Sequence, residues 1–226
     1  MEFSPEVLAA FPGICVAEGD IRSVAIAPQS PALEMEKNRA VRVLQSMYTI
    51  EKVKDEPVYR AYRDFFWSVG VDPTKTRPAS EALVRRILSG GMLPVINTAV
   101  DAYNLASAIS GVPIAAFDLD TLSGELAMRF AREGEEFLGI GMKKPVILRK
   151  NQVIIMDPVQ VIAVYPYRDS DSTKVTTSTR NIHLVSCGVP GINPSAVIGA
   201  YMACARYLET YTGGAPTGPV LCPRVQ

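Results

Sequence analysis

The apolar residues of this chain change their spacing part-way along its length, and this change limits the folds that it can adopt. Between residues 31 and 52, apolar side chains recur every three or four residues, as on one face of an amphipathic helix. Between residues 146 and 187, short apolar runs such as "QVIIM" and "VQVIAVYPY" are separated by turn residues, which is typical of neighbouring strands. Helices and strands alternate first, and strands dominate later. This order predicts an α/β (α+β) fold: a single mixed domain with a largely antiparallel sheet and flanking helices.

Capping residues and glycines give the expected limits of the elements. Ser4-Pro5 and Asn193-Pro194 each combine a capping side chain with a proline suited to the first helical turn. The expected helices cover residues 5–11, 31–52, 55–69, 80–88, 98–110 and 194–212. The expected strands before residue 146 cover residues 14–19, 23–27, 112–119 and 124–131. Residues 1–226 are expected to form one domain, in which the glycine- and proline-rich residues 213–226 form a loose tail.

The charge balance bears on the kind of partner that the chain can bind. Lysine and arginine total 23, and aspartate and glutamate also total 23, so the net charge is zero. Proteins that hold nucleic acid mainly through its phosphates are usually basic, which argues against strong non-specific binding of DNA or RNA. No apolar run reaches the roughly 18 residues that a membrane span needs, and the first residues do not resemble a signal peptide. We therefore expect a cytoplasmic protein that contacts neither DNA nor a membrane.

The cysteines and the single histidine give little support to a metal site. The four cysteines form no Cys-x-x-Cys pair, and His183 is the one histidine. Zinc sites usually need four well-placed ligands, so we expect no metal ion, and we expect no cofactor. A Ser-His-Asp triad would have to use His183. A lone histidine in an apolar strand is more typical of a packed side chain than of a catalyst.

Polar residues inside otherwise apolar elements mark the candidate site, because burying such groups without partners is costly. They form four groups: Arg77 with Ser80 and Glu81, Asn97 with Asp101 and Asn104, Asp118 with Asp120, and the turn 168–179 with Arg168, Asp169, Asp171, Thr173 and Thr176. Helical spacing places the second group on one face of a helix. Strand alternation directs both aspartates of the third group the same way.

Each group also has a structural interpretation. Asp101 can bond to a neighbouring backbone group or pair with Arg77, and one of Asp118 and Asp120 can cap the turn that follows. The turn 168–179 can be a solvated hairpin that is held by bonds between side chains and backbone. A small basic patch is typical of a solvated surface, although it could contact an RNA backbone; it consists of Lys143, Lys144, Arg149 and Lys150.

Motifs in a fixed order between residues 77 and 190 point to a family. They are Arg77-Pro78, the run "NTAVDAYN" from Asn97 to Asn104, the run "PIAAFDLD" from Pro113 to Asp120, Gly134-Glu135 and the polar turn 168–179. This pattern resembles the editing domain of the phenylalanyl-tRNA synthetase beta subunit, and more closely its free-standing relatives. The resemblance implies a helical N-terminal extension over residues 1–70 and an editing-like core over residues 71–212.

The resemblance implies an aminoacyl-tRNA deacylase that hydrolyses the ester of mischarged tRNA with water and without a metal. The implied partner is the aminoacyl end of tRNA. Asp171 stands where the synthetase loop has a glutamate, and Arg168 would meet a terminal phosphate or the carbonyl. The implied catalytic residues are Asp171, Asn97 and Thr173. The implied substrate-binding residues are Arg77, Glu81, Asp101, Asn104, Asp118, Arg168, Asp169 and Thr176. These side chains are expected to line one cleft.

One departure from the family pattern leaves alternatives open. The synthetase domain has a histidine just before Ala-Phe-Asp, and this chain has Ala115 there. Ester hydrolysis can continue without the histidine if backbone groups and the ribose hydroxyl of the tRNA position the water. The loss also suits a module that binds tRNA or a free amino acid without cleaving it. A third alternative is an enzyme that acts on another small ester or amide.

Overall fold

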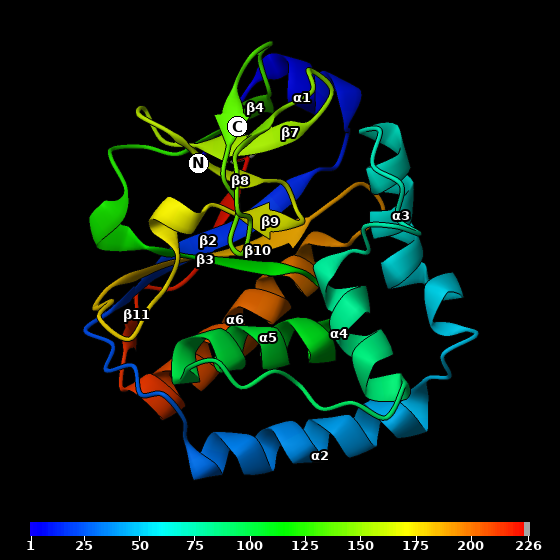
Figure 1. Ribbon diagram of the computed structural model, residues 1–226, viewed down its shortest axis with the longest axis vertical. Helices are drawn as coiled ribbons and strands as arrows, with labels where there is room; N and C mark the ends of the chain where they lie inside the picture. Colours follow the sequence, from blue (N-terminus) through cyan, green and yellow to red (C-terminus); the bar gives the residue numbers. More distant parts are fainter. Residues whose placement is uncertain (224–226) are drawn as a thin grey trace.

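Two sheets and their covering helices make up the part of the chain that the computed structural model describes, residues 1–223 (Figure 1). The first sheet has the order β1–β4–β7–β8–β9: Glu2–Phe3, Ala127–Phe130, Val153–Met156, Val161–Val164 and Arg168–Asp169. The second has the order β11–β2–β10–β3: Ala215–Pro216, Cys15–Arg22, Ile182–Gly188 and Ile114–Asp118, with β12 (Val220–Cys222) also paired with β2. A separate hairpin joins β5 (Glu136–Phe137) to β6 (Val146–Ile147).

The strand pairs confirm the expected mixed fold with a largely antiparallel sheet. Among the described strands, β1 and β4 form the one parallel pair, and the other pairings are antiparallel. Apolar side chains from both sheets share the main core, for example Met128 and Ile155 of the first sheet and Ala17 and Leu184 of the second.

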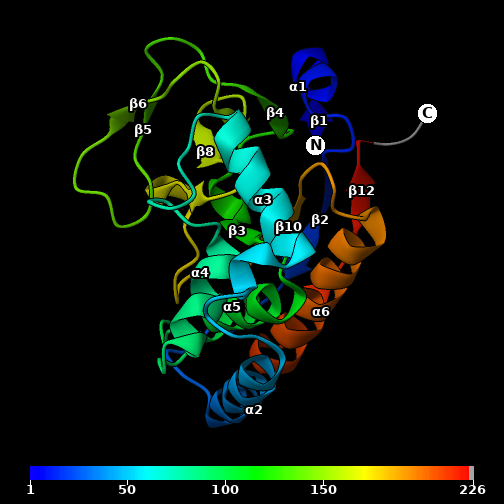
Figure 2. The same cartoon turned by 90° about the vertical axis from the view of Figure 1, so that its right-hand side faces the viewer.

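The helices lie on the side of the second sheet that faces away from the first (Figures 1 and 2). They are α1 (Pro5–Ala10), α2 (Pro31–Met47), α3 (Pro57–Ser68), α4 (Ala79–Leu88), α5 (Thr98–Ser110) and α6 (Pro194–Thr212), with short 3-10 turns at Val53–Asp55, Leu119–Thr121 and Asp171–Thr173. Helix α6 packs on β2 and β10, and α5 packs on α6 and β3. Helix α2 packs on α4 and α5, and both views place it at the end of the molecule opposite the first sheet. Two helices are exceptions to this layer. Helix α1 packs beside β4. Helix α3 runs along the side of both sheets, where Phe65 and Phe66 contact Tyr165 and Tyr167 (Figure 2).

Local signals account for most of the helix limits. Ser4, Ser30 and Asn193 each accept a bond from a backbone N–H in the first turn, and Gly111 and Gly213 end their helices with a φ of 73° and 69°. Helix α2 is shorter than expected, because Tyr48 turns to extended geometry. Helix α3 has Glu56 rather than Asp55 in its capping position.

Residues 23–27 were expected to form a strand, and they do not. The N–H of Val24 donates to the carbonyl of Arg180, and the N–H of Ala25 donates to that of Thr212. The backbone of this segment is therefore hydrogen-bonded to a loop and to the end of α6, and not to a neighbouring strand. Its apolar side chains are still buried at Val24 and Ile26, which explains the apolar alternation in the sequence.

The expectation of a loose tail is also wrong for the described part of residues 213–226. Strands β11 and β12 pair with β2 in antiparallel register, with Pro216 opposite Ile21 and Leu221 opposite Ala17. An unpaired edge on β2 would expose a row of backbone donors and acceptors, and pairing with β11 and β12 satisfies these groups. Residues 224–226 lie outside the described range.

Candidate functional site

The polar residues of α5 hold the helix in place. The Asn97 side chain caps the helix, accepting bonds from the N–H groups of Ala99 and Val100 at 3.1 and 2.9 Å. Asp101 is 1% exposed, and its carboxylate accepts a bond from Lys37 Nζ at 2.9 Å and another from the N–H of Ile96 at 2.9 Å. This face of α5 therefore meets α2 and the segment before α5. Asn104, one turn further on, is half-buried.

The residues at the start of α4 separate into a buried acid and an exposed base. Glu81 is fully buried and receives two contacts from Arg63, at 3.0 and 3.1 Å, with Arg85 at 3.9 Å. Arg77 is exposed and lines an open cavity with Arg85 and Arg86. Glu81 therefore forms ion pairs with arginines inside the protein and is not exposed to contact a ligand.

The paired aspartates after β3 stabilise the turns around them. Asp118 caps the short turn Leu119–Thr121 by accepting a bond from the N–H of Asp120, and it accepts a second bond from Thr179 Oγ1 at 2.6 Å. Asp120 accepts bonds from the Asn181 side chain at 3.2 Å. Both carboxylates join the 118–120 segment to the segment before β10.

The side chains of the polar turn 168–179 lie in different environments. Asp171 is half-exposed, pairs with Lys174 at 2.8 Å, and lines an open hollow of about 580 Å³ beside the β5–β6 hairpin. Thr173 is fully buried, and its hydroxyl has no hydrogen-bond partner among the described residues. The Thr176 hydroxyl lies 2.8 Å from that of Ser178, and both face outward.

A small cavity lies between β3, β9 and the start of α4, and it contains Ala115. Its volume is about 70 Å³, and Arg168 and Asp169 of β9 line it together with Ala79 of α4. Aromatic and apolar residues complete its wall: Pro113, Ile114, Ile155, Ala163, Val164, Tyr165, Pro166, Tyr167 and Cys187. Since a water molecule takes about 30 Å³ of liquid volume, the cavity has room for water and one small group.

Asp169 has an unusual ionisation equilibrium in this cavity. The residue as a whole is half-buried, but its carboxyl group is surrounded by protein atoms, and this burial raises its pKa to about 7. The Ala116 backbone and the Arg168 guanidinium oppose the shift without cancelling it. A carboxyl group that changes charge near neutral pH can accept or give a proton under cellular conditions.

The structure therefore brings together only part of the expected cleft. Arg168 and Asp169 share the small cavity with Ala115, whereas Asp171 and Arg77 each line a different hollow. The residues on the second side of the small cavity, such as Tyr165 and Tyr167, are apolar or aromatic and belong to a strand-like run. Nothing in their spacing separates them from core residues, so sequence reasoning did not find them.

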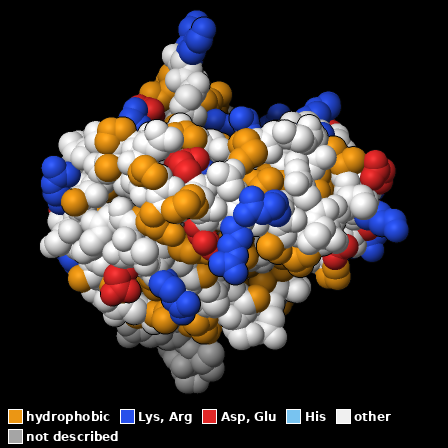
Figure 3. Space-filling view, turned by 90° about the horizontal axis from the view of Figure 1, so that it is seen from below, with side chains coloured by type: hydrophobic (Ala, Val, Ile, Leu, Met, Phe, Trp, Pro, Cys, Tyr) orange, Lys and Arg blue, Asp and Glu red, His pale blue; other side chains and the backbone are white. Residues whose placement is uncertain are grey.

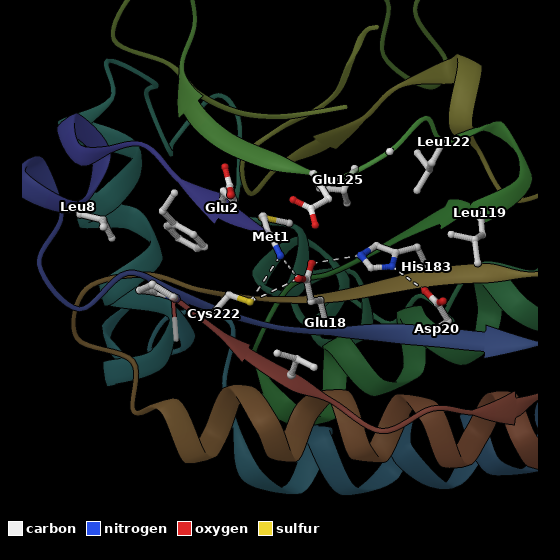
Figure 4. Close-up of a pocket in the computed structure, with 15 residues that line it drawn as sticks. Met1, Glu2, Leu8, Glu18, Asp20, Leu119, Leu122, Glu125, His183 and Cys222 are labelled. Carbon is white, nitrogen blue, oxygen red and sulfur yellow. Dashed lines mark hydrogen bonds and ion pairs between the residues drawn. The ribbon is translucent and has the colours of Figure 1, made fainter. Parts of the chain in front are cut away.

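A second, larger cavity of about 880 Å³ contains the one histidine (Figure 4). His183 of β10 lies between two carboxylates of β2: its Nδ1 is 2.9 Å from Asp20, and its Nε2 is 3.2 Å from Glu18. Glu18 is also bonded to the amino group of Met1. Figure 4 shows Glu2 and Glu125 on the same hollow. Both ring nitrogens of His183 are thus engaged, which agrees with a packed role rather than a catalytic one.

Comparison with known families decides between the two cavities. A model of the B3/4 domain matches residues 61–213. This chain belongs to the B3/4 domain family. Every residue that lines the small cavity lies inside the matched B3/4 segment. The larger cavity takes Glu18, Asp20 and several other residues from outside that segment. The small cavity is therefore the candidate functional site of this B3/4 domain.

The relatives of this B3/4 domain are much longer proteins. The phenylalanine–tRNA ligase beta subunit of Xanthomonas campestris (strain 8004) is 33% identical over 130 residues, which cover 58% of this chain and 16% of the subunit. The beta subunit of Malacoplasma penetrans is 28% identical over 118 residues, covering 52% of this chain and 15% of the subunit. The chain thus spans about a sixth of the length of the curated relatives that it matches.

A solved structure shares the fold of this B3/4 domain. The crystal structure of an N-terminal fragment of the phenylalanyl-tRNA synthetase beta subunit from Pyrococcus horikoshii matches with a TM-score of 0.55 and 12% identity. The match covers all of this chain and 54% of the fragment. At this identity the likeness concerns the fold.

Over the described residues, no helix has both the length and the apolar character that crossing a membrane requires.

The His183 cluster should make the stability of this B3/4 domain depend on pH. Burial acts to lower the pKa of His183, but the bonds to Asp20 and Glu18 outweigh it and raise that pKa above 6.5. The stabilisation from His183 is then complete below pH 6.5 and is lost as the pH rises through the folded pKa. The pKa of Glu18 is lowered to about 2, so its contribution is present above pH 4.5 and disappears as the pH falls toward 2.

Replacing His183 by glutamine tests this account. We expect a loss of about 1–3 kcal/mol in the free energy of unfolding at pH 6, because hydrogen bonds between charged groups are broken. The loss should be smaller at pH 9, because the charge of the histidine is lost as the pH rises through its raised pKa. Urea denaturation at the two pH values measures both quantities. An equal loss at pH 6 and pH 9 would contradict the charged state of His183.

Proposed function

We propose that this B3/4 domain hydrolyses the ester bond that joins an amino acid to tRNA. The observation that carries the proposal is Asp169, a carboxyl group with a pKa of about 7 in a cavity that has room for water. The family supports it as well, because the relatives are phenylalanine–tRNA ligase beta subunits, whose name states a reaction on tRNA. Acyl transfer to water needs a base of this kind near neutral pH.

The proposed reaction uses residues of the small cavity. The ionised Asp169 takes a proton from a water molecule while the water oxygen attacks the ester carbonyl carbon. The tetrahedral intermediate then collapses, the bond to the ribose oxygen breaks, and protonated Asp169 returns the proton to that oxygen. The products are a free amino acid and deacylated tRNA. Arg168 lines the same cavity, and its guanidinium would stabilise the negative charge on the carbonyl oxygen in the intermediate.

In the structure the Arg168 side chain lies against the loop between β5 and β6, so its guanidinium would have to turn toward the cavity to meet a ligand. Its Nη1 donates to the carbonyl of Ile140 at 2.9 Å, which leaves other N–H groups of the guanidinium for a ligand. The volume of the cavity limits what enters it to the reacting end of the substrate. The nucleotide would remain outside the cavity.

A panel of mischarged tRNAs tests the proposed reaction. Each radiolabelled aminoacyl-tRNA is incubated with the protein at pH 7.5, and the acid-precipitable label that remains is followed with time. We expect at least one member of the panel to lose its label clearly faster than in buffer. If every member decays at the buffer rate while the protein stays folded, the proposal of an esterase is wrong.

Ala115 favours a second candidate function, a module that binds aminoacyl-tRNA without cleaving it. The residue occupies the wall of the cavity, where the related synthetase pattern has a histidine, and its methyl group offers neither a donor nor an acceptor. Tight binding on the same panel without release of the amino acid would support this candidate. Release on any member would exclude it.

A further inference from the structure

An arginine-lined cavity lies along the exposed face of α4, apart from the small cavity. Its volume is about 460 Å³, and six residues line it: Ile50, Arg77, Ala82, Arg85, Arg86 and Ser89. Three of them, Ala82, Arg85 and Arg86, share one face of α4, and Ser89 follows at the C-terminal end of the helix. Arg77 reaches the same hollow from the segment before the helix.

Backbone groups hold two of the arginines without using up their donors. Arg86 donates from Nε to the carbonyl of Met92 at 2.7 Å, and Arg85 donates from Nη1 to the carbonyl of Ile50 at 3.1 Å. Each guanidinium has five N–H donors, so several remain free on both residues. The Arg77 side chain makes no hydrogen bond or ion pair with another residue of the described range. Arg85 and Arg86 are therefore oriented, and most donors of the three arginines have no partner among the described residues.

The charge of this cavity is not balanced by its own walls. None of the six lining residues is acidic. Glu81 is buried beneath the helix, where Arg63 holds it at 3.0 and 3.1 Å while Arg85 lies at 3.9 Å. On the face seen from below, basic side chains are interspersed with acidic and apolar ones (Figure 3). Three guanidinium groups around one hollow repel each other unless an anion joins them.

We infer that this cavity binds backbone phosphates of the RNA whose aminoacyl end occupies the small cavity. Phosphate oxygens match the planar donor pattern of arginine, and bidentate pairs of this kind are among the strong hydrogen bonds. The two cavities lie on either side of the start of α4, where Arg77 lines one and Ala79 lines the other. The inference rests on the proposed function for the identity of the RNA. Its chemistry, phosphate on arginine, does not depend on ester hydrolysis.

The salt dependence of RNA binding tests the inference. The affinity for deacylated tRNA is measured by fluorescence anisotropy at several salt concentrations, for the native protein and for the double variant R77A/R86A. Both residues are exposed, so the fold should persist, and a thermal melt checks this. Each phosphate contact in a single strand contributes roughly 0.7 to the slope of log affinity against log salt. We expect the slope to fall in magnitude by roughly 1.4 and the affinity at about 0.1 M salt to fall roughly tenfold or more.

Two further variants make the result specific. The matched control R39A/R206A removes two exposed arginines of α2 and α6 that do not line the cavity, and it should leave the slope unchanged. The variant R77K/R86K keeps the charge, so it should restore the slope while recovering only part of the affinity. An unchanged slope in R77A/R86A, or an equal loss of slope in the control R39A/R206A, overturns the arginine site. If the slope of R77A/R86A is unchanged but the protein still deacylates tRNA, the arginine site is rejected and the proposed function is not. If the slope falls as expected but the protein deacylates no tRNA, the proposed function is rejected and the arginine site is not.

Discussion

Replacing Asp169 by asparagine should lower the rate of aminoacyl-tRNA deacylation by about 10²- to 10⁴-fold, the usual contribution of a general base. Asparagine has nearly the same shape as aspartate but cannot accept a proton from water. In the native protein the enzyme-dependent rate should rise with pH through about 7 and then level, because the base must be ionised. The D169N variant should lose this inflection. Single-turnover assays on one mischarged tRNA, corrected for the buffer rate at each pH, measure both effects.

The stability of the D169N variant separates a role in the site from a role in the fold. A carboxyl group with a raised pKa stays protonated in the native state and ionises in the unfolded state between pH 4 and 7, so it lowers stability as the pH rises through that range. Asparagine removes this penalty, and D169N should be at least as stable as the native protein at pH 8. Asp171→Asn is the matched control in the same turn, and it should change the rate less than threefold or so, because Asp171 pairs with Lys174 outside the small cavity. A D169N protein that keeps its rate would remove Asp169 from the mechanism.

The second large effect concerns stability. Replacing Lys37 by alanine should lower the free energy of unfolding by about 3–5 kcal/mol, which is a substantial part of the 5–15 kcal/mol typical of a domain. Lys37 is 1% exposed, and its ammonium donates to Glu34, to the carbonyl of Pro94 and to Asp101 at 2.6, 2.7 and 2.9 Å. Without it, the buried Asp101 keeps its bond to Ile96 but loses its counter-charge. Urea denaturation followed by circular dichroism gives the change.

A double-mutant comparison tests whether the buried charge of Asp101 is the cause. In a K37A/D101N protein the unpaired carboxylate is absent, so the second substitution should recover about 1–3 kcal/mol of the loss. Lys174→Ala breaks an ion pair that is half-exposed on both sides and should cost less than about 1 kcal/mol. If K37A lowers the free energy of unfolding no more than Lys174→Ala does, the ion pair between Lys37 and Asp101 does not stabilise the packing of α2 on α5 as we describe.

Features that depend on neighbouring residues could be predicted from the sequence. The C-terminal limit of α5 was found because Gly111 is a local signal for the end of a helix, whereas the structure shows that Asn97, selected as a site residue, caps its start. The same helix shows why the site could not be predicted fully. Spacing placed Asn97 and Asp101 on one face, but only the packing of α2 against α5 decides that this face meets Lys37 rather than the turn 168–179.

Features that depend on distant partners were missed. The partners of His183 are Glu18 and Asp20, which lie more than 160 residues away and come beside it through the register of β2 and β10. The small cavity likewise joins β3, β9 and α4, and most of its wall is apolar. Asp169 was selected as a polar residue in an unusual turn, but its raised pKa depends on burial that no local pattern reveals.

The position of β2 also affects how the protein can be made. This strand is synthesised well before its partners, because the strands that pair with its two edges, β10 on one side and β11 and β12 on the other, come from residues 182–222. Until residues 182–222 have been added, the backbone of β2 has no partner strand, and its apolar residues remain accessible to chaperones or to other nascent chains. The second sheet can therefore close only after residues 182–222 have been synthesised, and distant pairing of this kind makes folding slow.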